Sequence, residues 1–401
     1  MTVSISVIIP VLDQWRLTEA CLRSLAGTSP DDIEVIVVDN GSTDETPLHC
    51  ARLGPALFGA RFRHIRLHDN INFGPACNLG AREARGELLF FLNNDTEMNG
   101  PWAEKLATDL GRRNLGGTGP LLLYPGGSVQ HAGIVFTPML TTRHLFEHFP
   151  ADHPLLAARR PLQAITGAAL LMRASVFKQL GGFYPEFRNG GEDIDLCARI
   201  RALGLGLEIC PEVRVTHATS QTAGRFDHDR HNADLLCARQ RHAFVPDYHR
   251  IMADCGYAVR LTPWLSPYAC LEERTNALRT RASAGAELHA VLAALTEEPL
   301  WQGGYGLAKT KTEDRQLLLR ITLNECRFFP SVNAFQELET LAEDNRPLKL
   351  HARENLARIR TRLERKQELF AQARLIQSNA RRDNDPTLVR AVDDWLRRPP
   401  A

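Results

Sequence analysis

The sequence predicts an α/β protein in which a mixed sheet flanked by helices is followed by a mainly α-helical C-terminal region. Short apolar runs alternate with segments of helical spacing through the first half of the chain, which is typical of strand-helix-strand units. Beyond about residue 225 the strand signals fade and the long segments have helical spacing. With 401 residues, two or three domains are expected. We therefore expect one domain over residues 1–225 and a helical region over residues 226–401.

The expected strands are continuous apolar runs bounded by turn residues, and the expected helices have apolar residues three and four positions apart. The strands are expected at residues 5–9, 34–38, 62–67, 88–92, 121–124, 129–136, 165–173 and 213–216. The helices are expected at residues 17–25, 75–84, 102–112, 192–203, 278–295, 312–327 and 348–382. The alternation predicts parallel pairing with right-handed crossovers in the first half of the chain.

Composition excludes several classes of protein. The formal net charge is +1, so no global field favours nucleic acid, and no nucleic-acid partner is expected. The nine cysteines are odd in number and contain no C-x-x-C pair, which favours reduced thiols over a disulfide framework. No apolar run approaches the ~20 residues that span a bilayer. The first apolar run has no basic segment before it and breaks at Pro10, so it is interpreted as a strand and not as a signal peptide. A cytoplasmic protein is expected.

Asp39 follows the expected strand 34–38, and Asn40-Gly41 allows a sharp turn after it. Ser42 or Thr43 can cap the next helix, which is a sufficient structural explanation for that part of the turn. It does not explain Asp39, whose carboxylate can accept hydrogen bonds from the base or ribose of a nucleotide.

The segment Asn70 to Pro75 begins a helix and includes Asn72 and Gly74. Gly and Pro at a helix start suit close approach of a ligand to free backbone N–H groups. An ordinary loop-helix junction explains this segment equally well.

Asn93, Asn94 and Asp95 follow the buried run 88–92. A hard carboxylate at the end of a buried strand is suited to hold Mg²⁺ or Mn²⁺ against a diphosphate. A turn built from Asn and Asp is the alternative. The presence of two other acidic clusters favours the metal.

Glu192, Asp193 and Asp195 lie at the start of an expected helix, directly after Gly190-Gly191. Acidic residues stabilise the positive end of a helix dipole, which is a structural explanation for them. A carboxylate on a rigid helix start is also well mounted to act as a general base.

Two groups of histidines are weighed. His217 ends the expected strand 213–216, where a surface role is the more common one unless the fold brings it near Asp95. His144 and His148 have i,i+4 spacing that could bind a transition metal, but no helix is predicted there, and this site is not favoured.

The expected helix 348–382 is strongly basic. Residues 346–382 contain eleven Lys or Arg and three Glu, a local net charge of 11 − 3 = +8. One interpretation is a helix packed on the protein body with a solvated charged face. The other is recruitment of an anionic partner, either a lipid-diphosphate acceptor or the inner face of a membrane, which would make the protein peripheral.

Residues 3–225 resemble inverting family 2 glycosyltransferases of the GT-A (Rossmann-like) fold, in the rhamnosyltransferase-like branch. The resemblance rests on five ordered blocks. The blocks are residues 6–10, 37–44, 92–97, 130–133, and 166–168 continuing into 191–197 and 217. Residues 226–401 resemble no family that we can name.

The resemblance implies roles for particular residues. Pro10, Asp39, Asn72, Gly74 and Asn94 would bind the donor. Asp95 would be the carboxylate of the Asp-x-Asp metal motif, with His217 near the metal or the diphosphate. Asp193 would be the catalytic base, with Glu192 beside it. Two departures are the residue pair Leu12-Asp13, where the family usually has Tyr-Asn, and Asn93 at the first position of the metal motif.

The function implied by the resemblance is metal-dependent, inverting transfer of a hexosyl or deoxyhexosyl group. The donor would be a UDP- or dTDP-sugar and the cofactor Mg²⁺ or Mn²⁺. The acceptor would be a saccharide, a lipid-linked or a protein hydroxyl, in assembly of a bacterial surface polysaccharide or glycoconjugate. Two alternatives are a nucleotidyltransferase and a catalytically silent scaffold subunit. A nucleotidyltransferase is expected to carry a Gly-rich basic loop after its first strand, and this chain has no such loop after strand 5–9. The intact carboxylates disfavour a scaffold subunit.

Overall fold

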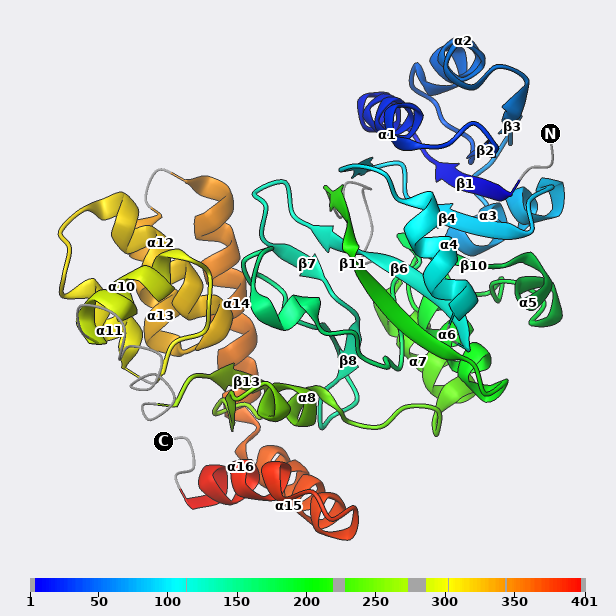
Figure 1. Ribbon diagram of the computed structural model, residues 1–401. Helices are drawn as coiled ribbons and strands as arrows, with labels where there is room; N and C mark the ends of the chain where they lie inside the picture. The colour runs from blue at the N-terminus through cyan, green and yellow to red at the C-terminus, as the bar shows by residue number, and fades with distance from the viewer. Residues whose placement is uncertain are drawn as a thin grey trace. The chain divides into compact units, whose positions relative to one another are not determined.

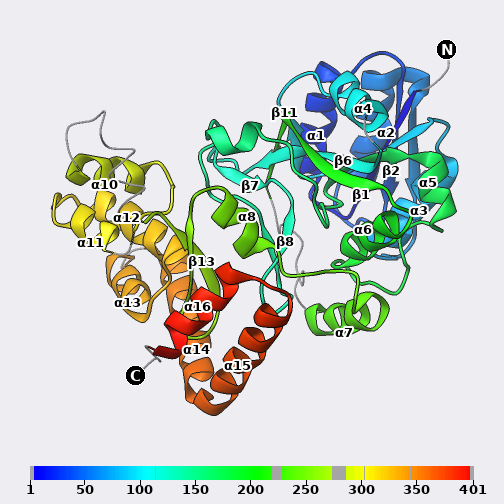
Figure 2. The same ribbon diagram turned by 60° about the horizontal axis from the view of Figure 1, so that its bottom comes forward.

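The computed structural model, drawn in Figures 1 and 2, divides the chain into two compact units. The described residues are 4–112, 114–218, 228–272, 286–301, 303–342 and 345–397. The N-terminal unit comprises Met1–Val135, His144–Glu147 and Ala151–Val245. The C-terminal unit comprises Phe136–Arg143, His148–Pro150 and Pro246–Ala401. The boundary predicted at residues 225 and 226 lies outside the described residues.

The N-terminal unit is built on one mixed sheet with the strand order β3-β2-β1-β4-β10-β6-β11-β5, and β7 pairs with β6. Strands β3, β2, β1 and β4 are parallel, β10 runs antiparallel to both of its neighbours, and β6 and β11 are parallel to each other. The predicted mixed sheet is therefore confirmed. The strands are β1 (Ile5–Val11), β2 (Ile33–Asp39), β3 (Phe62–Arg66), β4 (Leu88–Leu92), β5 (Thr96–Met98), β6 (Leu115–Leu123), β7 (Val129–His131), β10 (Ala169–Arg173) and β11 (Gly206–His217).

Helices cover both faces of this sheet. Alternate residues of β2 point to opposite faces: Val35 and Val37 pack in the main core with α1, α2 and α4, whereas Ile36 and Val38 pack against α3. A side chain at Gly80 of α3 would place its Cβ 2.5 Å from Ile8, so this glycine lets the helix approach the sheet closely. The helices are α1 (Trp15–Thr28), α2 (Thr46–Phe58), η1 (Gly59–Arg61), α3 (Phe73–Glu83), α4 (Ala103–Arg112), η2 (Pro154–Ala157), α5 (Ala174–Gln179), α6 (Glu192–Ala202) and α7 (Asp229–Gln240).

The C-terminal unit is mainly helical, as predicted. Its helices are α8 (Tyr248–Asp254), α10 (Ala286–Leu295), α11 (Gly304–Lys309), α12 (Arg315–Phe328), α13 (Val332–Leu341), α14 (Arg346–Glu364), α15 (Lys366–Arg382) and α16 (Pro386–Arg397). Two small sheets pair β12 (Ala258–Leu261) with β13 (Pro267–Cys270), and β8 (Ile134–Phe136) with β9 (Thr142–His144). No helix among the described residues is long and apolar enough to cross a bilayer.

Two predicted strands are corrected by the structure, and one predicted helix lies partly outside the described residues. The strand predicted at 129–136 is two strands, β7 and β8, because the chain turns at Gly133 with a φ of +120°. The strand predicted at 165–173 begins only at Ala169, and residues 278–285 of a predicted helix lie outside the described residues.

The basic helix predicted at 348–382 is two helices, α14 and α15, separated at Arg365 (Figures 1 and 2). Neither glycine nor proline marks the break. Its cause is tertiary packing: Leu356 and Ile359 of α14 pack in a core with α12 and α13, whereas Leu369 and Ile376 of α15 pack against α16. The apolar stripe of this segment is therefore used inside the C-terminal unit.

Candidate active site

The N-terminal unit contains a cavity of about 370 Å³ at the edge of the sheet where β1 and β4 end. Because β1 and β4 are parallel, their carboxyl ends meet at this edge, which is where ligands bind in open α/β sheets. Strand β10 runs antiparallel to β4, so the residues just before β10, Thr166 to Ala168, lie at the same edge of the sheet. The lining residues are Pro10, Val11, Leu12, Gln14, Leu17, Asn40, Asn70, Phe73, Asn93, Asn94, Asp95, Leu122, Gln130, His144, Thr166, Gly167, Ala168, Asn189, Glu192, Asp193 and His217.

Asp95 and His217 lie side by side in this cavity. Pairing of β5 with β11 sets Thr96 opposite His217, and this register brings Asp95 Oδ1 to 3.1 Å from His217 Nε2. Both side chains are largely buried. The fold therefore brings His217 next to Asp95, which was the condition for a functional role of His217.

Gln130 fixes the orientation of the His217 ring. Its Nε2 donates to the backbone carbonyl of His217 (3.0 Å), which leaves Oε1 as an acceptor 2.6 Å from His217 Nδ1. The proton therefore belongs on Nδ1, and in the neutral ring the lone pair of Nε2 faces Asp95. Sequence reasoning assigned no role to Gln130, although it opens the fourth of the five blocks that carry the resemblance.

The pair of Asp95 and His217 fits a divalent cation. A carboxylate oxygen and an imidazole lone pair at 3.1 Å are two acceptors facing each other, which requires a proton or a cation between them. Ligands about 2.1 Å from an octahedral ion lie about 3 Å apart, close to the observed distance. Two protein ligands would leave the other positions to diphosphate oxygens and water.

Asp193 is held at the start of α6 by backbone N–H groups. Its Oδ2 accepts a hydrogen bond from Gly167 N–H (2.9 Å) and its Oδ1 from Ile194 N–H (2.8 Å). Gly167 permits this approach, since a Cβ there would lie 3.3 Å from the Cβ of Asp193. The side chain is half-buried, lines the cavity, and forms no ion pair with any cationic side chain among the described residues. This is the position of a carboxylate that can accept a proton from a bound molecule.

Glu192 is buried beside Asp193, and its carboxylate accepts a hydrogen bond from Gly190 N–H (2.6 Å). It shapes the turn that begins α6. Gly191 at this turn has a φ of +89°, a conformation that favours glycine. Glu192 also lines the cavity, so both predicted catalytic residues are present there.

Asp195 is structural, unlike its neighbour Asp193. Its fully buried carboxylate accepts hydrogen bonds from Arg199 Nε (2.9 Å), Arg239 Nε (2.8 Å) and Gln240 Nε2 (2.8 Å). Burial raises its pKa, but the hydrogen bonds from Arg239 and Gln240 and the charges of the two arginines outweigh burial and hold the pKa below its ordinary value. Asp195 thus ties α6 to α7.

The predicted donor-binding residues divide into two groups. Pro10 and Asn94 line the cavity, whereas Asp39, Asn72 and Gly74 do not. Asp39 is fully buried and accepts a hydrogen bond from Ser42 N–H (2.8 Å). Burial opposes ionisation of Asp39, but the imidazole of His64, 3.6 Å from its carboxylate, and the hydrogen bond from Ser42 lower its pKa below the ordinary value.

Asn72 and Gly74 contribute to the backbone conformation and packing next to the cavity. Asn72 has a φ of +69°, and its carbonyl accepts a hydrogen bond from Asn40 Nδ2 (3.3 Å). Gly74 lies against Phe183, with which a Cβ would be in tight contact at 3.1 Å. Asn40, which does line the cavity, was not predicted as a site residue.

The departure at Leu12-Asp13 has a structural consequence. Asp13 Oδ1 accepts hydrogen bonds from Thr43 N–H (2.7 Å) and Asp44 N–H (3.1 Å), and Asp44 in turn accepts from Trp15 N–H (3.1 Å). These bonds join the loop after β1 to the loop after β2. Leu12 lines the cavity.

His131 and His144 form a buried pair next to the cavity, with their Nδ1 atoms 2.7 Å apart. Burial lowers the pKa of both imidazoles, so both are neutral and one Nδ1–H donates to the other. His144 lines the cavity. Its spacing from His148 drew attention to this loop in the sequence, but the partner in the structure is His131.

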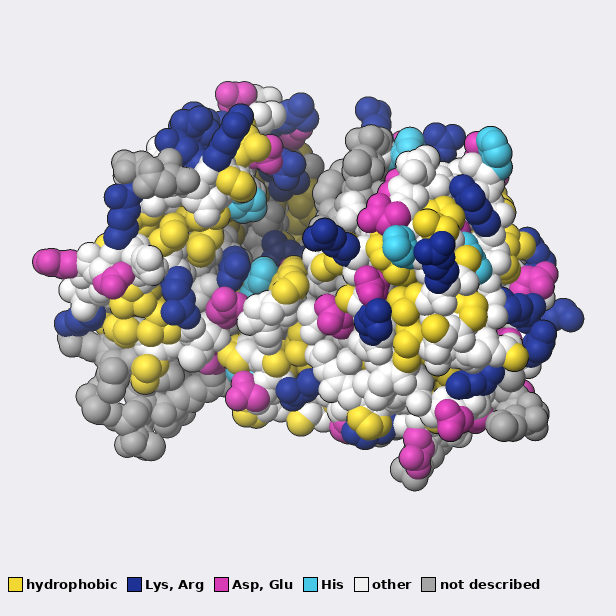
Figure 3. Space-filling model, turned by 90° about the horizontal axis from the view of Figure 1, so that it is seen from above, with side chains coloured by type: hydrophobic (Ala, Val, Ile, Leu, Met, Phe, Trp, Pro, Cys, Tyr) yellow, Lys and Arg dark blue, Asp and Glu magenta, His cyan; other side chains and the backbone are white. Residues whose placement is uncertain are grey.

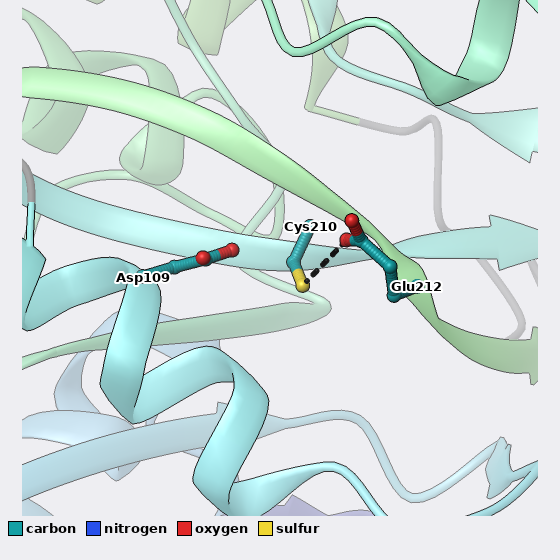
Figure 4. A group of neighbouring side chains, drawn as sticks. All are labelled: Asp109, Cys210 and Glu212. Atoms are coloured by element: carbon teal, nitrogen blue, oxygen red, sulfur yellow. Dashed lines mark hydrogen bonds between the residues drawn. The ribbon is translucent and has the colours of Figure 1, made fainter.

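A second cluster, Asp109, Cys210 and Glu212, has ligand atoms close enough together to suit a metal (Figure 4). The guanidinium of Arg159 already neutralises it through Asp109 and through Glu212 (2.6 Å). Burial raises the pKa of the Cys210 thiol to about 12, so the free thiol is protonated at neutral pH. This cluster is an ion-pair network around an arginine.

The parts of the chain that match known protein families are the parts that contain the cavity. The model of the glycosyl transferase family 2 matches residues 6–181, which carry most of the cavity. This part of the chain is similar to glycosyl transferase family 2. A second model, described as the N-terminal domain of galactosyltransferase, matches residues 147–224 and contains Asp193 and His217.

Two relatives match the same part of the chain. The O-antigen biosynthesis protein RfbC of Myxococcus xanthus is 33% identical over 229 residues, 55% of this chain and 18% of that protein. The N-acetylglucosaminyl-diphospho-decaprenol L-rhamnosyltransferase of Mycobacterium tuberculosis is 26% identical over 235 residues, 52% of this chain and 73% of that protein. The match thus spans less than a fifth of the first relative's length.

A solved structure, that of GalNAc-T7 with UDP, GalNAc and Mn²⁺, aligns with a TM-score of 0.47 at 18% identity. The alignment covers 61% of this chain and 52% of that chain.

Proposed function

We propose that this protein is a metal-dependent, inverting glycosyltransferase that moves a sugar from a nucleoside-diphosphate-sugar to a hydroxyl acceptor. The observation that carries the proposal is the presence of two different carboxylate sites in one cavity. Asp95 is paired with His217 and suits a cation. Asp193 accepts hydrogen bonds only from backbone N–H groups among the described residues, which suits a carboxylate that takes up a proton.

The residues at the cation site would hold the donor diphosphate. When bound, Mg²⁺ or Mn²⁺ neutralises the charge that develops on the leaving diphosphate. Asp95 supplies an anionic oxygen, His217 supplies a neutral nitrogen, and Gln130 keeps the ring in that orientation. Pro10, Asn40 and Asn94 line the part of the cavity available to the rest of the donor.

Asp193 would act on the acceptor. A hydroxyl of the acceptor attacks the anomeric carbon from the face opposite the diphosphate, so a new C–O bond forms as the bond to the diphosphate oxygen breaks. The hydroxyl proton passes to a carboxylate oxygen of Asp193, and the configuration at the anomeric carbon inverts. The N–H groups of Gly167 and Ile194 hold the carboxylate in place throughout.

The acceptor class is proposed from the relatives' names. One is named for O-antigen biosynthesis and another for rhamnosyl transfer to a diphospho-decaprenol acceptor. These names favour a saccharide or lipid-linked acceptor in assembly of a bacterial surface polysaccharide, with a UDP- or dTDP-sugar as donor.

The test is a donor screen with the full chain. UDP-, dTDP- and GDP-sugars are incubated with and without Mn²⁺ and with excess EDTA, and the released nucleotide is measured. The expected result is release from one donor class that EDTA abolishes, with NMR showing the opposite anomer in the product. Retention of configuration would contradict the inverting mechanism. A nucleotidyltransferase would instead release pyrophosphate from a nucleoside triphosphate, and a scaffold would release nothing.

A further inference from the structure

The C-terminal unit contains a groove of about 770 Å³ with a strongly basic lining. It is lined by Arg143, Trp264, Ser266, Cys326, Arg327, Pro330, Phe335, Asn355, Ala357, Arg358, Ile359, Thr361, Arg362 and Arg365. Five of these residues are arginines, and the lining contains no aspartate or glutamate. A basic lining without acidic residues selects an anion.

One face of α14 supplies most of the charge. Arg358 and Arg362 are one helical turn apart and therefore lie on the same face of the helix, and both are exposed. Like charges at this spacing destabilise a helix. Among the described residues neither guanidinium has a carboxylate partner, and Arg365 reaches Glu368 only at 3.7 Å on an exposed surface. Both arginines of the pair are thus available to a ligand.

The other two arginines are held in place. Arg327 forms an ion pair with Glu297 (3.3 Å) and a hydrogen bond with Asn324 (3.2 Å). Arg143 lies over the ring of Tyr248, 5.5 Å from its centroid. The groove therefore combines two fixed guanidinium groups with two unpaired ones on α14.

The floor beneath these arginines is part of a packed hydrophobic core. Trp264, Phe335 and Ile359 are each less than 10% exposed and belong to one hydrophobic core cluster with α12, α13 and α14. A groove set in a packed core keeps its shape without a ligand. Its volume exceeds that of a single phosphate, so it has room for a diphosphate and part of the group that carries it.

We propose that this arginine groove is a binding site for a phosphate or diphosphate group carried by a larger molecule. The planar fork of a guanidinium donates two parallel hydrogen bonds to phosphate oxygens, and several arginines around one anion give both affinity and geometry. The site does not depend on the function proposed for the N-terminal unit, because all of its lining residues lie in the C-terminal unit.

The experiment is calorimetric titration of the full chain with inorganic pyrophosphate at low ionic strength. EDTA is present, so that no divalent metal can bridge pyrophosphate to the catalytic cavity. The test variant is Arg358→Glu with Arg362→Glu. The matched control is Arg360→Glu with Arg374→Glu, which makes the same change of charge at exposed positions of α14 and α15 outside the groove. This control is needed because Lys and Arg side chains also gather over the helices on the left of Figure 3.

The test variant is expected to weaken pyrophosphate binding by about tenfold or more, since two charge-assisted contacts are lost. The control variant and Asp95→Ala are expected to bind like the wild type. Equal weakening in the test and control variants would show that only general surface charge is involved, and would overturn the proposal. Absence of binding to the wild type at low salt would overturn it as well.

A second arm identifies the source of the phosphate. The protein is sedimented with two kinds of phosphatidylcholine vesicle. One contains a polyprenyl diphosphate, and the other contains phosphatidylglycerol in the amount that gives the same total negative charge. Recruitment by the polyprenyl diphosphate alone, lost in the test variant, supports the site with a lipid-borne ligand. Pyrophosphate binding without recruitment supports it with a water-soluble one. Recruitment to phosphatidylglycerol that both double variants lose equally contradicts a specific site.

Discussion

The contrast between Asp193 and Asp195 gives a sharp test, because the two carboxylates are two residues apart and have different surroundings. Replacing Asp195 with Asn removes a fully buried charge that meets two guanidinium groups and one amide. The Asn side chain keeps one oxygen as an acceptor, but its N–H₂ group faces side chains that are themselves hydrogen-bond donors, Arg199, Arg239 or Gln240. The cationic partners then lose most of their compensation in a largely buried site.

The expected cost follows from these contacts. Breaking a buried ion pair by removing one partner costs about 3–5 kcal/mol. The lower end applies, because the side chains of Arg199 and Arg239 remain 19% and 25% exposed and can take up water. We expect Asp195→Asn to lower the free energy of unfolding of the N-terminal unit by about 3 kcal/mol.

The assay is urea unfolding followed by circular dichroism, with Asp193→Asn as the matched control. Asp193 is half-buried and, among the described residues, is hydrogen-bonded only to backbone N–H groups, so its replacement is expected to change stability by less than about 1 kcal/mol. Equal stability losses in the two variants would refute the assignment of separate structural and chemical roles.

Two further predictions concern Gln130 and Asp385. Gln130→Leu removes both hydrogen bonds that orient His217, so the Mn²⁺ affinity measured with bound nucleotide should fall about 10–100-fold. Gln130→Glu keeps an acceptor for His217 Nδ1 and should lose less affinity. Unchanged affinity in the Leu variant would exclude the positioning role. Burial raises the pKa of Asp385, but hydrogen bonds from His249, Leu388 N–H and Arg250 outweigh burial and lower it to about 2. A lowered carboxyl pKa contributes stability above the unfolded value of about 3.9, and this contribution is lost as pH falls toward 2. The wild type should therefore lose more stability than Asp385→Asn between about pH 4 and pH 2, and parallel acid curves would contradict this.

The sheet was predictable because its strands are buried on both faces. Strands such as β1 and β2 are short, fully buried and consist mostly of Val and Ile, which favours a strand over a helix. Helix α2 was not predicted, since Pro47 and Pro55 and the short apolar spacing mask its periodicity. The division of residues 348–382 into α14 and α15 also could not be predicted, because only packing against α13 and α16 decides it.

The site was predictable where a residue type and a strand end coincide. Asp95, Asp193 and His217 each follow or begin a regular element, and all three line the cavity. Asp39 satisfies the same rule, yet its carboxylate is buried and bonded to Ser42. Gln130 was assigned no role and His144 was considered only with His148, because their partners in the structure, His217 and His131, lie 87 and 13 residues away. Local sequence carries no signal for such pairs.

Asp193→Asn, assayed for both sugar transfer and nucleotide binding, tests the central claim most directly. The Asn oxygen can still accept the hydrogen bond from Gly167 N–H, but it cannot take up the acceptor proton. The account predicts that transfer falls by at least about 10²-fold while Mn²⁺-dependent nucleotide affinity stays within a few-fold of the wild type. Near-normal transfer by this variant would contradict the assignment of Asp193 as the base.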